Sequence, residues 1–221
     1  MKIFATSDIH GNKIIIDKLE RIAPSADMVI VCGDIGGKDL SRCDTLRDIS
    51  EKQKKDAGYL VDRMKRTAVP FRYILGNDDW FECAGANYLK STESICGYGF
   101  QPFELVPITP FNTNREFNEN KIRYELDKMV CDERTVVVAH APPRGCGDVL
   151  YNGSHVGSRA VSDWIACIQP RAWLCGHIHE NYSVNKIGRS LIFNCSCDHL
   201  KDLLRGWMID LDSMEYESVR I

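Results

Sequence analysis

Residues 2–11 read Lys-Ile-Phe-Ala-Thr-Ser-Asp-Ile-His-Gly, a short apolar run that passes directly into polar side chains. The run from Lys2 to Ser7 predicts a buried β-strand. Asp8 and His10 follow it two positions apart, and alternate residues of an extended chain point to the same side. The sequence therefore predicts a strand whose carboxyl end presents two metal-ligating side chains to one point.

Four more apolar runs end in the same way, in side chains of the types that ligate metals. The runs cover Met28 to Cys32, Phe71 to Leu75, Thr135 to Ala139 and Ala172 to Cys175. They are followed by Gly33-Asp34, Gly76-Asn77-Asp78-Asp79, His140 and Gly176-His177-Ile178-His179. Open α/β sheets bind ligands beyond the carboxyl ends of their strands, so these ends predict one shared site.

The strand ends carry seven candidate metal ligands, which comprise four imidazoles, two carboxylates and one amide oxygen. These ligands are Asp8, His10, Asp34, Asn77, His140, His177 and His179. Seven donors are too many for one ordinary metal ion and suit two ions that share a bridging carboxylate. A single histidine at a strand end is more often structural, but four of the six histidines lie in such positions. We therefore predict a dinuclear metal site.

Helical patterns separate these strands and indicate the α/β class. Helices are expected near Asn12 to Ile22, Ser41 to Arg66, Glu116 to Val130 and Ser158 to Ile168. Two later stretches, Tyr182 to Cys195 and Leu203 to Ile221, indicate more antiparallel strands. Because no repeat, low-complexity tract or linker marks a boundary, we expect residues 1–221 to form one domain with mixed sheets.

The composition of the chain argues against nucleic acid and membranes as binding partners. Among 221 residues, 28 Lys and Arg face 31 Asp and Glu, and this net charge of -3 gives no general attraction to nucleic acid or anionic lipid. The apolar runs are far shorter than the roughly 20 residues of a membrane-spanning helix. The net charge and the short apolar runs therefore predict a protein that binds neither membrane nor nucleic acid. The N-terminus lacks the features of a signal peptide, so we expect a cytoplasmic location. The ten cysteines lie mostly in apolar stretches and are interpreted as thiols rather than disulfides.

The whole set of motifs resembles the calcineurin-like metallophosphoesterase superfamily, in the form of a small prokaryotic-type member. The motifs are Asp8-x-His10, Gly33-Asp34, Gly76-Asn77-x-Asp79, His140 and Gly176-His177-x-His179, in this order. The resemblance implies two mixed β-sheets packed as a sandwich and flanked by helices. It implies one metal held by Asp8, His10 and His179, a second held by Asn77, His140 and His177, and Asp34 as the bridge. It also points to manganese or iron, with zinc, nickel or cobalt as alternatives.

The activity that this resemblance implies is hydrolysis of phosphate esters, with small phosphodiesters or nucleotides as substrates. Two divalent ions activate a water molecule and neutralise charge on a phosphoryl group, so no protein nucleophile is needed. Four positive charges less the two of Asp8 and Asp34 leave a centre of about +2 that suits an anion. The residues expected to take part in catalysis are Asp34, Asn77, Asp78 and His140.

Asp78 departs from the commonest pattern of the superfamily, which has a histidine after Gly76-Asn77. In relatives that histidine is proposed to contact the phosphate or to protonate the leaving group. Nearby cations lower the pKa of a carboxyl, so Asp78 would be ionised and a poor general acid. Its charge would penalise a dianionic monoester more than a monoanionic diester. The sequence therefore predicts a preference for phosphodiesters.

Three further side chains are candidates for substrate contact. Arg144 lies in the Pro-rich loop after His140, where a guanidinium could hold a phosphate oxygen or simply be an exposed charge. His155 precedes a predicted helix whose N-terminal amides favour anions, with loop packing as the other interpretation. Asn194 follows the strand from Leu191 to Phe193 and would line the pocket or form a turn.

A second candidate metal group is Cys195-Ser196-Cys197 with Asp198 and His199 beside it. A structural zinc site usually has four ligands, and no partnering pair of cysteines occurs elsewhere. Thiols in a loop or in the core are therefore the favoured interpretation of this segment.

Two other functions compete with hydrolysis of small molecules. A protein-interaction scaffold of the same fold would be expected to have lost metal ligands, whereas all seven positions are filled here. A nuclease would be expected to carry a basic stripe or a capping domain, and neither is evident. The sequence does not predict an oligomeric state.

Overall fold

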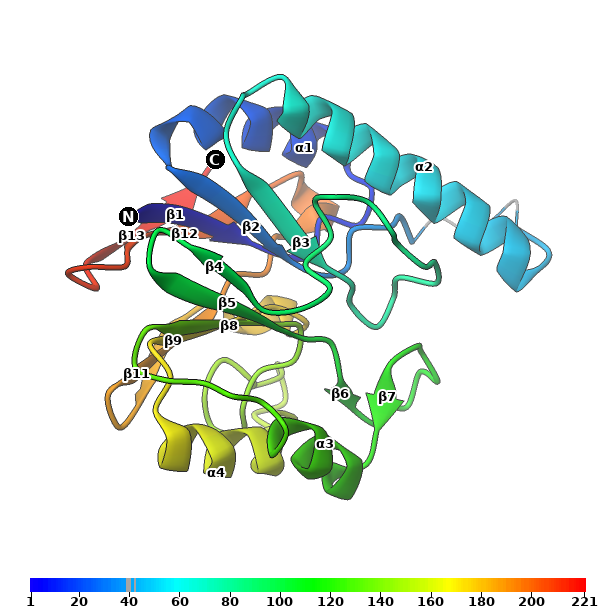
Figure 1. The fold of residues 1–221 in the computed structure, drawn as a ribbon. Helices are drawn as coiled ribbons and strands as arrows, with labels where there is room; N and C mark the ends of the chain where they lie inside the picture. Colours follow the sequence, from blue (N-terminus) through cyan, green and yellow to red (C-terminus); the bar gives the residue numbers. More distant parts are fainter. Residues whose placement is uncertain (39–40, 42) are drawn as a thin grey trace.

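The computed structural model describes residues 1–38, 41 and 43–221 of the chain. Two β-sheets lie face to face, and helices cover the outer face of each sheet (Figure 1). This arrangement confirms the predicted class of mixed sheets flanked by helices. Among the described residues, no helix is both long enough and apolar enough to cross a membrane.

The first sheet has five strands and carries the N-terminal end of the chain. In spatial order they are β13 (Tyr216–Arg220), β12 (Arg205–Asp210), β1 (Lys2–Thr6), β2 (Met28–Cys32) and β3 (Phe71–Ile74). β1, β2 and β3 run parallel, while β12 and β13 are antiparallel to their neighbours. Three parallel strands thus end on the same side of this sheet.

The second sheet has six strands. In spatial order they are β10 (Val184–Ile187), β11 (Ser190–Asn194), β9 (Ala172–Cys175), β8 (Thr135–Ala139), β5 (Tyr98–Phe103) and β4 (Glu93–Ile95). The four central strands run parallel, and β10 and β4 are antiparallel edges. A separate short pair joins β6 (Val106–Pro107) to β7 (Glu116–Phe117).

The helices lie where the sequence predicts them, with shorter spans in two cases. They are α1 (Lys13–Ile22), α2 (Leu46–Lys65), α3 (Glu119–Leu126) and α4 (Arg159–Ile168). α2 starts at Leu46 because Thr45 and Asp48 form a capping box, and residue 42 of the expected helix lies outside the described residues. α3 starts at Glu119 because Asn118 caps it and the preceding residues form β7.

Alternating side chains of each central strand serve two different cores. Ile3 and Ala5 of β1 face the second sheet, whereas Phe4 packs beneath α1 and α2. In β8, Val136 faces the first sheet and Val137 packs beneath α3 and α4. Because both faces are covered, residues 3–5 of β1 and 136–139 of β8 are all apolar, which explains the uninterrupted runs in the sequence.

Candidate metal centre

Backbone hydrogen bonds tie together the loops that follow the parallel strands. After β1 and β2, Asp8 N donates to Gly33 O at 3.1 Å and His10 N donates to Asp34 O at 2.9 Å. After β8 and β9, Gly176 N donates to His140 O at 2.9 Å. The predicted convergence of strand ends from both sheets is therefore present.

Four of the predicted ligands have left-handed backbone conformations. The φ angles are 59° at Asp8, 47° at His10, 52° at Asp34 and 70° at His177. A side chain other than glycine rarely adopts such angles, and their cost of about 1–3 kcal/mol per residue is tolerated mainly at functional sites. The strain turns these side chains out of the strand direction and toward one another.

Asp8, His10 and His179 form the first group of ligand atoms. Asp8 Oδ1 lies 3.0 Å from His179 Nε2, and His10 Nε2 lies 3.4 Å from the same nitrogen. Atoms bound to one ion through bonds of about 2.1 Å lie about 3.0–3.4 Å apart. Two of the three distances therefore suit a single cation between these side chains, while Asp8 Oδ1 and His10 Nε2 lie farther apart, at 3.9 Å.

Asn77 and His140 form the second group, and hydrogen bonds to neighbouring residues fix the orientation of both side chains. His140 Nε2 lies 3.0 Å from Asn77 Oδ1. The other ring nitrogen of His140, Nδ1, lies 2.7 Å from Cys32 O and donates to it, which leaves Nε2 as the nitrogen that would bind an ion. Asn77 Nδ2 donates to Thr113 Oγ1 at 2.8 Å, which directs the amide oxygen toward His140.

Asp34 lies between the two groups. Its Oδ2 is 3.6 Å from His10 Nε2 and 3.5 Å from His140 Nε2. Its Oδ1 accepts a hydrogen bond from Asp78 N at 2.9 Å, which fixes the carboxylate plane. A carboxylate oxygen almost equidistant from both groups is placed as a bridge would be.

His177 completes the cluster of seven predicted ligands. Its ring centroid lies 5.2 Å from that of His140. Its backbone N–H donates to Asp8 Oδ2 at 3.0 Å, so the second group is tied directly to a ligand of the first. The structure thus brings all seven side chains into one site, in which five residues are buried and His177 and His179 are half-buried.

The site balances buried carboxylates against imidazoles. Burial alone raises the pKa of Asp8, but a hydrogen bond with His179 and the charges of His179, His140 and His10 together outweigh burial and leave that pKa well below the usual value. Burial lowers the pKa of His140, but Asp34 outweighs it and raises the pKa to about 10. In the absence of a cation, protons on imidazoles therefore supply the positive charge that the carboxylates require.

Two other imidazoles are neutral and offer lone pairs. Burial lowers the pKa of His10 to about 3 and that of His177 to about 4. A neutral imidazole is the form that ligates a metal. Ligand type, spacing and charge together fit divalent cations.

Two glycines allow the carboxylates of Asp34 and Asp8 to pack directly against the backbone. A Cβ on Gly76 would collide with Asp34 Oδ1, and a Cβ on Gly176 would collide with Asp8 Oδ2. Each ligand carboxylate therefore packs where only a glycine leaves room.

Comparison with known proteins assigns the family. A family model described as calcineurin-like phosphoesterase matches residues 1–181. The chain belongs to this family, as its motifs predict. An uncharacterised protein of Methanocaldococcus jannaschii is 30% identical over 208 residues, which are 89% of this chain and 88% of that protein.

Solved structures share the fold of this phosphoesterase family member at low identity. A dimetal phosphatase from Danio rerio has a TM-score of 0.58 at 12% identity, over 100% of this chain and 98% of that one. A structure from Thermus thermophilus has a TM-score of 0.64 at 14% identity, over 99% and 97% of the two chains. A structure described as a novel archaeal phosphodiesterase has a TM-score of 0.50 at 13% identity, over 100% of both.

Asp79, to which the sequence assigned no role, holds two ligand-bearing loops together. It is buried and accepts hydrogen bonds from Ile35 N at 3.0 Å, Gly36 N at 2.8 Å and Gly76 N at 2.8 Å. The first two donors follow β2 and the third follows β3. Asp79 therefore fixes the spacing between Asp34 and Asn77 without facing a metal.

We expect Asp79→Ala to lower the free energy of unfolding by about 3 kcal/mol or more, because three buried N–H groups lose their acceptor. Asp79→Asn retains one oxygen and should cost less. Urea unfolding of the metal-free protein measures both, with Asp62→Ala, an exposed carboxyl of α2, as the control. An Asp79→Ala variant as stable as the control would contradict this role.

The same carboxyl makes the stability of the metal-free protein depend on pH. Burial and the charge of Asp34 raise the pKa of Asp79 to about 7. The unfolded chain loses this proton near pH 4 while the folded chain keeps it, so stability falls as pH rises from about 4 to about 7. Asp79→Asn should remove this part of the slope.

An open cleft of about 580 Å³ leads to the ligands. Its described lining comprises Asp34, Lys38, Asn77, Asp78, Pro107, Ile108, Thr109, Pro110, Phe111, Thr113, Leu150, Val156, His177, Ile178, His179 and Glu180. The sequence interpretation missed Lys38 and the segment between β6 and β7, although Ile108 and Phe111 are apolar residues in a loop. Phe111 is 77% exposed at the rim.

Asp78 reaches this cleft with a cation beside it. Lys38 Nζ lies 2.9 Å from Asp78 Oδ2. The prediction that Asp78 repels dianionic substrates considered the charge of Asp78 without this partner, and the charge of Lys38 offsets it.

The three secondary candidates lie apart from the described lining of the cleft. Arg144 is exposed, and its Nη1 donates to His155 O at 2.7 Å. His155 Nδ1 lies 2.7 Å from Asp148 Oδ1. Asn194 is buried and its Nδ2 donates to Gly147 O at 2.8 Å and Ile178 O at 3.0 Å, which supports the loop of His177. Substrate contact by these residues stays a prediction.

The cysteine-rich segment is part of the core. Cys195 and Cys197 are buried, and all ten cysteines are free thiols. Burial raises the pKa of the Cys197 thiol to about 11, so it is protonated at neutral pH. His199 of the same segment points elsewhere, toward His10 and His179.

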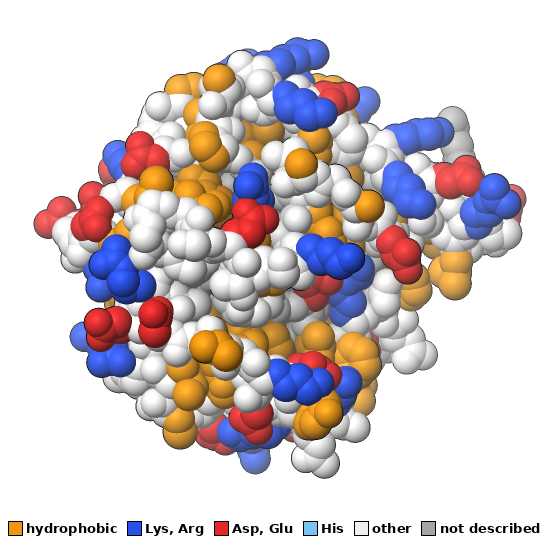
Figure 2. All heavy atoms as spheres, viewed as in Figure 1, with side chains coloured by type: hydrophobic (Ala, Val, Ile, Leu, Met, Phe, Trp, Pro, Cys, Tyr) orange, Lys and Arg blue, Asp and Glu red, His pale blue; other side chains and the backbone are white. Residues whose placement is uncertain are grey.

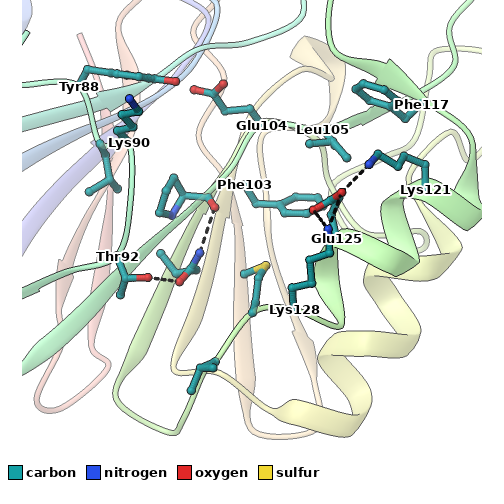
Figure 3. A pocket seen from close by; sticks show the side chains of 15 residues that line it. Tyr88, Lys90, Thr92, Phe103, Glu104, Leu105, Phe117, Lys121, Glu125 and Lys128 are labelled. Atoms are coloured by element: carbon teal, nitrogen blue, oxygen red, sulfur yellow. Dashed lines mark hydrogen bonds and ion pairs between the residues drawn. The ribbon is translucent and has the colours of Figure 1, made fainter. Parts of the chain in front are cut away.

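A second depression, of about 660 Å³, lies beside β5 and α3, away from the ligands. Figure 3 shows Glu125 between Lys121 and Lys128, both of which it pairs with. One carboxylate therefore offsets part of the charge of these two lysines.

Proposed function

We propose that this chain is a metal-dependent hydrolase that acts on small phosphodiesters or nucleotides through a dinuclear centre. The observation that carries the proposal is the position of Asp34 Oδ2, at 3.6 Å and 3.5 Å from imidazoles of two separate ligand groups. Two similar folds described as a dimetal phosphatase and an archaeal phosphodiesterase support the same reaction class.

Asp8, His10 and His179 would hold one ion, Asn77, His140 and His177 the other, and Asp34 both. When bound, two divalent ions supply Lewis acidity toward the phosphate and lower the pKa of a water molecule. The mixture of imidazole and carboxylate donors suits manganese or iron, with zinc, nickel or cobalt as alternatives. The protein's own contribution is orientation, through the contacts of His140 with Cys32 O and of Asn77 with Thr113.

The cleft walls suit a phosphate that carries an apolar or flat group. Pro107, Ile108 and Phe111 form one wall and Val156 contributes from another loop, close to the ligands His177 and His179. Such a wall would bury the alcohol portion of an ester while the ions hold the phosphate. Without a histidine at position 78 to protonate the leaving group, esters of acidic alcohols should react fastest.

The Lys38–Asp78 pair should tune the preference between monoesters and diesters. Lys38→Met leaves Asp78 uncompensated and should lower the monoester-to-diester ratio of kcat/KM about tenfold, whereas Asp78→Asn should raise it by a similar factor. A unit charge about 6 Å from the phosphate contributes at most about 3 kcal/mol before salt screening. Matched nitrophenyl esters measure the ratio, with Lys65→Met as the surface control. Unchanged ratios in both variants would place the pair outside the reach of the phosphate.

A reconstitution screen tests the proposed function itself. Metal-stripped protein receives each divalent ion in turn and is assayed with nitrophenyl monoesters and diesters, cyclic nucleotides and linear DNA. Hydrolysis of small diesters is the expected result. Two bound ions without hydrolysis of any substrate would favour the interaction scaffold, and a preference for DNA would favour the nuclease.

The surface charge and the cysteines support two further proposals, which are that the protein does not bind nucleic acid and that it is cytoplasmic. Figure 2 shows basic and acidic side chains interspersed on the displayed face, which gives nucleic acid no basic stripe there. Ten free thiols suit a reducing compartment such as the cytoplasm. We also propose that residues 1–221 act as one domain.

A further inference from the structure

His199 is an imidazole beside the metal centre that none of the family motifs includes. It lies in a short 3₁₀ helix, η3 (His199–Lys201), which follows β11. Its ring centroid is 4.3 Å from that of His10 and 5.0 Å from that of His179. One ligand nitrogen from each of the three rings lies within 4.8 Å of the other two.

The ring of His199 lacks the contacts of a structural histidine. Its Nδ1 is buried and has no hydrogen-bond partner among the described residues. A buried polar atom without a partner is costly, so such an atom calls for a specific explanation. An ion between the three imidazoles would give the ring of His199 a partner, since one of its nitrogens lies within 4.8 Å of a ligand nitrogen of His10 and of His179.

The backbone that carries His199 is fixed to the loop that carries His10. Asn12 Nδ2 donates to His199 O at 2.9 Å and to Asp202 Oδ1 at 2.7 Å. The Oδ1 atom of Asn12 caps α1 by accepting from Ile15 N. One side chain, two residues after His10, thus sets the distance between the two histidines, as preorganised ligands require.

We propose that His199 is an additional ligand of the ion held by Asp8, His10 and His179. The inference rests on the proposed dinuclear centre. With Asp34 as the bridge, this ion would have five donors, which are Asp8, His10, His179, His199 and Asp34. The other ion would have four donors, which are Asn77, His140, His177 and Asp34. The two sites would therefore differ in affinity, with the imidazole-rich site the tighter one and more selective for later first-row ions.

Contact with substrate is the competing role for His199, and the cleft argues against it. The described lining of the cleft includes His177 and His179 but not His199. His199 approaches the first group of ligands from the side of His10, which is itself buried. A ligand position fits this placement, whereas a substrate would have to reach past His179.

Metal titration of the His199→Asn variant tests the proposal. Cobalt(II) is added to metal-free protein in competition with a chelator, and both dissociation constants and the visible spectrum are recorded. We expect the tighter site to weaken by about 10–100-fold, while the weaker site changes little. The ligand-field bands should move to longer wavelength, because a water oxygen is a weaker-field donor than imidazole. Free imidazole should partly restore the spectrum in His199→Ala.

His155→Asn, which removes the chain's one histidine outside the cluster, is the matched control and should leave both constants and the spectrum unchanged. Wild-type constants and spectrum in His199→Asn would overturn the inference. A wild type that binds one ion at most would instead overturn the dinuclear centre. If the variant does not fold, the ring ¹⁵N chemical shifts of the zinc-loaded wild type decide. Zinc should shift the signals of five of the six histidines, all except His155. A shift of only four rings, without that of His199, would overturn the inference.

Discussion

Asp34→Asn is expected to lower the proposed phosphodiesterase activity on the order of 1,000-fold and to reduce metal binding from the proposed two ions to one or none per chain. The substitution keeps the shape of the side chain but removes its charge and replaces one oxygen with an NH₂ group. Asp34 Oδ2 faces His10 and Asp34 Oδ1 accepts from Asp78 N. No orientation of the amide can satisfy both the backbone donor and two cations.

Steady-state kinetics on a nitrophenyl diester and elemental analysis of the loaded protein measure the two effects. Arg144→Ala and His155→Asn serve for comparison, because both side chains lie away from the ligands and should cost less than tenfold. Comparable losses in all three variants, or two tightly bound ions in Asp34→Asn, would contradict the bridging role.

The meeting of the candidate metal ligands could be predicted from the sequence because each of them follows a short strand made mostly of apolar residues. Two covered faces make β2 and β8 uninterrupted apolar runs, and the polar residue that follows marks the strand end. Parallel strands in a sheet then bring such ends together whatever their separation along the chain. The prediction therefore needed only local pattern and one topological rule.

The neighbours of the ligands could not be predicted in this way. His199 lies 189 positions from His10, in a segment without periodicity, and contacts between the two segments, those of Asn12 among them, bring the two histidines together. The sequence interpretation weighed it with Cys195 and Cys197, which fold into the core instead. Lys38 likewise pairs with Asp78 across two loops. β5 was missed because Gly99 and Pro102 interrupt its strand pattern.

Metal binding should release protons, and the affinity for the ions should rise with pH. In the metal-free fold the pKa of His140 is raised to about 10, and Asp8 raises that of His179 against the effect of burial. At pH 7 an incoming ion must therefore displace a proton from His140 at least. Each displaced proton makes the affinity about tenfold weaker for every pH unit below the raised pKa.

The stability of the metal-free fold should change in the opposite direction. A histidine whose folded pKa is raised stabilises the fold fully below its unfolded pKa of about 6.5, and this contribution is lost as pH rises toward about 10. Ions at 1,000 times their dissociation constant should add about 4 kcal/mol per site to the free energy of unfolding. Chelation should therefore lower Tm most at alkaline pH, where the ions bind tightly and protonated histidines no longer stabilise the metal-free fold. Titration calorimetry in buffers of different ionisation enthalpy counts the protons, and thermal unfolding with and without chelator between pH 6 and 8 follows the stability. Binding without proton release and with the same dissociation constants across this range would mean that His140 is already neutral, and that Asp34 does not hold a proton on it.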